Sequence, residues 1–77
     1  MQNYQAQLVQ RQSDLALAQA QADRQQRLLA EMATSQDAYD VAQATLKSSQ
    51  AQVRSMQAQI AQSQSTLKAD QATLGYS

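Results

Sequence analysis

An apolar residue stands at every seventh position through the second half of this chain, and this spacing constrains the fold more than any other feature. The row consists of Tyr39, Leu46, Val53, Ile60, Leu67 and Leu74. Because seven residues are about two turns of α-helix, a long helix gathers the row into one stripe. The positions three residues further on alternate large with small or polar side chains, namely Ala42, Ser49, Met56, Ser63 and Asp70. The pattern predicts a coiled-coil helix.

The first half of the chain repeats the spacing with more interruptions. Its row is Met1, Leu8, Leu15, Ala22 and Leu29, and its companion positions are Tyr4, Arg11, Ala18, Gln25 and Met32. One antiparallel register satisfies both halves, because it pairs Leu8 with Ile60, Leu15 with Val53, Ala22 with Leu46, and Leu29 with Tyr39. The same register pairs Tyr4 with Ser63, Arg11 with Met56, Ala18 with Ser49, and Gln25 with Ala42. The sequence therefore predicts an all-α, two-helix antiparallel coiled-coil hairpin.

The two halves meet at a turn of residues 31–35 that contains neither glycine nor proline. Thr34 and Ser35 are both favourable N-cap residues, and Asp37 follows where a first-turn carboxylate stabilises the helix dipole. Thr34 with Asp37 three residues later resembles a capping box. We expect a single hairpin over residues 1–77, with helices at about 2–31 and 36–74 and a tip turn at 32–35.

The composition agrees with continuous helix and excludes several other classes of protein. Of the 77 residues, 18 are glutamine and 15 are alanine, and none is proline. The absence of cysteine and histidine excludes a disulfide framework and a cysteine or histidine zinc site, and no catalytic set of residues can be assembled. Six basic and six acidic residues cancel, so no net field attracts nucleic acid. We expect a non-enzymatic rod of about 45 Å without a cofactor.

The residues around the turn, from Arg24 to Asp40, resemble the tip of the α-helical hairpin of periplasmic membrane fusion proteins, the adaptor family that includes MacA, AcrA and HlyD. In that family the tip motif is an arginine, a leucine four residues later and a serine seven residues beyond. Arg24, Leu28 and Ser35 have this spacing. The closing segment 72–77 is similar to the family's exit from the hairpin into its lipoyl-like domain. The turn and this segment favour the MacA branch, which works with an ABC transporter, over the AcrA branch with its RND pump.

The resemblance covers essentially the whole chain and implies a function. It implies a hairpin belonging to a larger adaptor with lipoyl and β-barrel domains, located in the periplasm and anchored to the inner membrane. The tip would dock on a TolC-like outer-membrane channel, and the adaptors would form a homo-oligomer, a hexamer in the assembled pump. Ala38 replaces the glutamate frequent in the family, and the family's tip-loop glycine is absent. No membrane insertion by this segment is expected, since no apolar run approaches about 20 residues.

Further interpretations bear on these residues and on the chain as a whole. Ser35 is explained as well by helix capping as by contact with a channel. Leu17 and Gln21 lie on the same flank as Arg24 and predict a lateral contact between hairpins, through glutamine amides that hydrogen-bond without charge repulsion. The chain as a whole could instead be a structural coiled-coil spacer with no channel-docking role. A lipid-binding helix pair is disfavoured, because the apolar stripe is narrow and bordered by glutamine.

Overall fold

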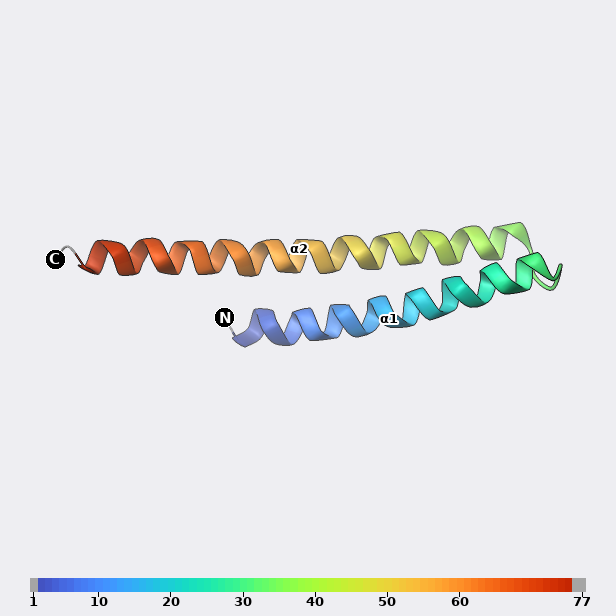
Figure 1. Cartoon of the computed structure of the whole chain (residues 1–77), viewed down its shortest axis with the longest axis horizontal. Helices are drawn as coiled ribbons and strands as arrows, with labels where there is room; N and C mark the ends of the chain where they lie inside the picture. The colour runs from blue at the N-terminus through green and yellow to red at the C-terminus, as the bar shows by residue number, and fades with distance from the viewer. Residues whose placement is uncertain (1, 76–77) are drawn as a thin grey trace.

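The computed structural model describes the backbone of residues 2–75 and the side chains of residues 3–72. Helix α1 spans Gln2–Ala30 and helix α2 spans Gln36–Gly75, and a short loop joins them (Figure 1). The helices run antiparallel and contact each other, which confirms the predicted two-helix hairpin with its turn near residues 32–35. Met1 and Leu74 of the predicted apolar rows lie outside the residues with described side chains.

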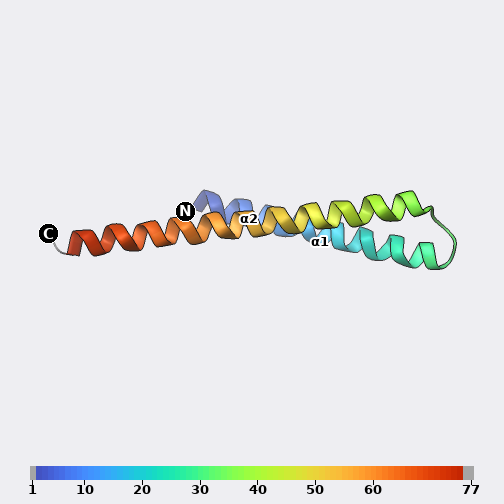
Figure 2. The ribbon, with the colours of Figure 1, turned by 90° about the horizontal axis from the view of Figure 1, so that it is seen from above.

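The molecule is a thin rod of 68 × 16 × 12 Å. It is longer than the expected 45 Å because α2 has 40 residues and α1 only 29, and each helical residue adds about 1.5 Å. Figure 1 shows α2 continuing past the start of α1, so the last turns of α2 have no partner helix. In the perpendicular view of Figure 2 the two helices cross, as in a coiled coil.

The buried residues form one seam between the helices. Ala18 and Ala22 on α1 are 3% and 1% exposed, and they form a cluster with Leu46, against which Leu15 and Ala42 pack. The predicted opposition of Ala22 and Leu46 is therefore confirmed. Val53 and Met56 extend the buried row along α2. The small alanine side chains leave room for Leu46 between the helices.

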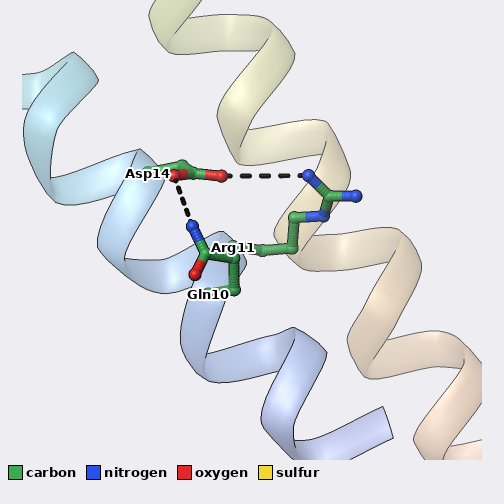
Figure 3. A network of polar contacts seen from close by, with 3 residues as sticks. All are labelled: Gln10, Arg11 and Asp14. Carbon is green, nitrogen blue, oxygen red and sulfur yellow. Dashed lines mark hydrogen bonds and ion pairs between the residues drawn. The ribbon is translucent and has the colours of Figure 1, made fainter. Parts of the chain in front are cut away.

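The seam weakens towards the open end of the rod, where four predicted seam positions are exposed, Asp70 among them. Tyr4 is 36% exposed, in a hollow that it lines together with the small Ser63 of α2. Leu67 is 45% exposed, because α2 extends beyond the start of α1 here. Arg11 is also exposed and forms an ion pair along its own helix, with 3.8 Å between its Nη1 and the Oδ2 of Asp14 (Figure 3). The Nε2 of Gln10 donates a hydrogen bond of 3.1 Å to the same carboxylate. Most of the core therefore lies in the middle of the paired helices.

Candidate docking site at the hairpin tip

Helix α1 ends in a Schellman motif, a C-terminal cap with two characteristic backbone hydrogen bonds. The N–H of Ala33 donates to the carbonyl of Leu28 at 2.7 Å, and the N–H of Met32 donates to the carbonyl of Leu29 at 3.0 Å. Met32 is the left-handed residue of the motif, with φ at 58°. These bonds satisfy carbonyl groups that the end of the helix would otherwise leave without partners. The motif ends α1 at Ala30, and the backbone leaves the helical conformation fully at Met32.

Met32 is an unusual residue for this position. Glycine is the common residue here, because a side chain in the left-handed region costs about 1 kcal/mol. The heptad count predicted Met32 as a seam position, and this prediction is wrong, since the residue is 93% exposed. The physical reason is that α1 stops at Ala30, so the row cannot continue along the helix face.

Helix α2 begins with Ser35 as its N-cap. The N–H of Ala38 donates to Ser35 Oγ at 3.1 Å, and the N–H of Tyr39 donates to the Ser35 carbonyl at 3.2 Å. The predicted capping box of Thr34 and Asp37 does not form, because Ser35 is the N-cap and Thr34 lies one residue before it. Its hydroxyl instead donates a 2.8 Å hydrogen bond to Oε1 of Gln25 on α1. This bond ties the loop to the first helix, so both ends of the turn are held by local contacts.

The structure places the three residues of the predicted tip motif at the loop end of the rod. Arg24 and Ser35 are exposed and Leu28 is partly buried. Arg24 and Leu28 lie one helical turn apart on α1, so they share a face. Ser35 lies across the loop at the start of α2. The three residues therefore surround the end of the hairpin from both helices.

A shallow groove of about 250 Å³ runs beside Arg24 between the two helices. It is lined by Gln21, Arg24 and Gln25 of α1 and by Ala38, Val41, Ala42 and Thr45 of α2. The groove thus brings Gln21 and Arg24 together with α2, whereas Leu28 and Ser35 are not among its lining residues. Val41 is 65% exposed, and the sequence reasoning missed it. Its signal in the sequence was a β-branched apolar residue at a position outside the two seam rows, two places after Tyr39.

Comparison with protein families decides what kind of hairpin this is. The family model described as the α-helical hairpin domain of RND membrane fusion proteins matches residues 1–77. The chain belongs to this membrane fusion protein family. No curated protein and no solved structure matches it significantly. The family match leaves the preference for the MacA branch as a prediction.

Membership of the membrane fusion protein family indicates the general role of the hairpin. Hairpins of this family are non-catalytic adaptors that associate with an inner-membrane transporter and an outer-membrane channel. Over the residues that the structure describes, no group of acidic, histidine or cysteine side chains could hold a metal ion. In the same part of the chain, neither helix is long and apolar enough to cross a membrane.

The membrane fusion hairpin has a distinctive edge beside its seam. The position after each companion residue is glutamine on both helices in the paired region, at Gln5, Gln12, Gln19 and Gln26 on α1 and at Gln43, Gln50, Gln57 and Gln64 on α2. Coiled coils commonly carry charged residues at these flanking positions, which set partner and register. Here the edge is neutral. On the other edge, Leu17 is 60% exposed and Gln21 is exposed.

Proposed function

We propose that this hairpin is the connecting rod of a periplasmic adaptor, and that its tip docks on a TolC-like outer-membrane channel. The observation that carries the proposal is the position of Arg24 and Leu28. They form an exposed cation and a partly exposed leucine on one face, at the loop end of a rod whose family consists of pump adaptors. A partly exposed leucine beside an exposed arginine at the end of a rod supports the proposal of a binding surface.

Each residue of the tip has a separate task in the proposed contact. The guanidinium of Arg24 offers several N–H donors to carboxylate or carbonyl oxygens of a channel. Leu28 supplies apolar area. Ser35 Oγ accepts the hydrogen bond from Ala38, yet its O–H remains available as a donor. Capping and docking are therefore compatible in Ser35, because they use different hydrogen-bonding capacities of one hydroxyl group.

The contact of one tip is small, so the assembly depends on several copies. A rod only 16 × 12 Å across presents far less than the roughly 800 Å² per partner of a standard interface. Several tips held in one ring would bind with an effective concentration that no single tip reaches. We propose a homo-oligomer of adaptors, a hexamer in the assembled pump, around the end of the channel.

We further propose that neighbouring hairpins touch through the flank that carries Leu17 and Gln21. Both side chains are exposed, and the neutral amide of Gln21 can hydrogen-bond to a neighbouring hairpin without charge repulsion. Because these 77 residues contain no cysteine, Leu17→Cys and Gln21→Cys each place a single thiol on the hairpin. In the complete adaptor we expect ladders of oligomers from these positions and none from Ala58→Cys on the outer face of α2. If neither position 17 nor position 21 gives such ladders, the proposed lateral contact is wrong.

The rest of the adaptor follows from the family. We propose that the hairpin belongs to a larger periplasmic protein, anchored to the inner membrane, whose lipoyl and β-barrel domains meet the transporter. The family description supports an RND transporter, while the turn and closing segment favour the ABC transporter of the MacA branch. The closing segment lies almost wholly outside the residues with described side chains. The pump would export drugs or secreted proteins through the channel.

An export assay in cells tests tip docking. In the complete adaptor, Leu28→Ser and Arg24→Asp should each reduce export at least tenfold, because each removes or reverses one chemical component of the tip. Matched controls are Val9→Ser and Arg54→Asp, which change an exposed apolar residue and an exposed arginine away from the tip. The controls should leave export unchanged. If the tip variants also export normally, the hairpin is a spacer without a docking role.

A further inference from the structure

The apex of the hairpin contains a residue that is unfavourable for the isolated fold in two ways. Met32 adopts a left-handed backbone conformation, with φ at 58°, that favours glycine. Its side chain is also 93% exposed, so no packing within the hairpin offsets this conformation. A strained residue at an exposed apex is a reason to look for a function.

The backbone of the turn does not require a methionine. The two hydrogen bonds of the Schellman motif use the N–H groups of Met32 and Ala33, and glycine at position 32 would make the same bonds. Glycine would do so without a side chain in the left-handed region and without an exposed apolar group. What methionine adds is therefore the side chain itself.

The surroundings of Met32 continue the apolar part of the tip. Ala33 is exposed beside it, Leu28 is partly buried one turn earlier, and the carbonyl of Leu28 accepts the hydrogen bond of Ala33. The residues from Met32 to Thr34 carry no charge. Methionine is flexible and polarisable, so it fills irregular apolar gaps on a partner. The apolar part of the apex is therefore Met32 with Ala33, between the exposed charge of Glu31 and the polar Thr34.

We propose that Met32 is a docking residue, inserting into an apolar cleft between helix ends at the periplasmic mouth of the channel. The inference rests on the proposed function, because it names a further contact of the same tip. The occupant of the apex is the channel, since Figure 1 shows the loop at one end of the rod, whereas α2 ends at the other end and α1 begins part-way along it, so the loop is the free end of the hairpin. The contact adds to those of Arg24 and Leu28 and lies closest to the partner.

The test is a substitution whose effects on stability and on docking have opposite signs. Met32→Gly should raise the Tm of the chain by about 4–8 °C, because it removes the left-handed strain. In the complete adaptor, the same change should weaken binding to a purified TolC-type channel about tenfold, because one buried apolar side chain is lost. Circular dichroism gives the first quantity, and surface plasmon resonance with the channel in detergent gives the second.

Two further substitutions separate the side chain from the backbone. Met32→Asn tolerates the left-handed conformation but is polar, so binding should fall as it does with glycine. Met32→Leu keeps an apolar side chain of similar size and the same backbone cost, so Tm and binding should both stay near their original values. Binding by the glycine and asparagine variants that equals binding by the original chain would overturn the proposal.

The variants of the neighbouring residues distinguish this failure from a failure of the proposed function. If Leu28→Ser and Arg24→Asp weaken binding while Met32→Gly does not, the tip docks without Met32 and only the inference about Met32 is wrong. If none of the three substitutions weakens binding, docking by the tip is wrong, and the role of Met32 is wrong with it.

Discussion

Replacing Leu46 by alanine should unfold the hairpin at room temperature. Leu46 is 8% exposed and belongs to the central cluster with Ala18 and Ala22. Removing a buried leucine side chain and leaving a cavity typically lowers the free energy of unfolding by about 2–5 kcal/mol. The free energy of unfolding of a two-helix hairpin is small, because the burial of a few side chains must offset the conformational entropy lost by two long helices. Far-ultraviolet circular dichroism should show most of the helical signal lost.

Leu67→Ala is the matched control for this prediction. It removes the same side chain from the same row of α2, but Leu67 is 45% exposed because it lies near the end of the paired region. Its cost should stay below about 1 kcal/mol. Equal destabilisation by both substitutions would contradict the account of a core concentrated in the middle of the rod.

Ala22→Asp should be at least as destructive. Ala22 is 1% exposed, the lowest value in the core, and the described residues around it include no buried polar or charged group that could pair with a carboxylate. An unpaired buried charge costs about 3 kcal/mol or more, and the larger side chain also forces the helices apart. Chemical denaturation should show no cooperative unfolding transition.

Ala20→Asp controls for the helix propensity of aspartate. Ala20 is exposed on α1 two positions earlier, so the same substitution there costs about 0.7 kcal/mol through propensity alone. The difference between the two variants isolates burial from propensity. A difference close to zero would show that the helices do not pack at Ala22, and the antiparallel register would then need revision.

The middle of the fold could be predicted from sequence because its pattern is redundant. Each helix has two rows of residues spaced by seven, and one antiparallel register matches them. This register places Ala22 against Leu46, as the structure does. The ends are less determined. Arg11 occupies a seam position by count, yet it pairs with Asp14 on its own helix, because a guanidinium gains more from a nearby carboxylate and water than from an apolar seam.

The turn was harder to predict in detail because its chemistry permits several solutions. Both Thr34 and Ser35 can cap a helix, and the contact of Thr34 with Gln25, nine residues earlier, accompanies the choice of Ser35 as the cap. The end of α1 had no glycine as a signal, so the heptad count ran on to Met32. Local rules therefore placed the turn, while contacts across the loop fixed the positions of its side chains.

Docking of the tip on a channel is the central claim, and site-specific photo-cross-linking in cells tests it most directly. A photoreactive amino acid at position 28 of the complete adaptor places the probe at the tip, and the same amino acid at position 54 places it on the exposed middle of α2. We predict a covalent adduct between the adaptor and a TolC-like channel from position 28 and none from position 54. Adducts from position 54 alone, or from neither position in an exporting cell, would contradict the claim.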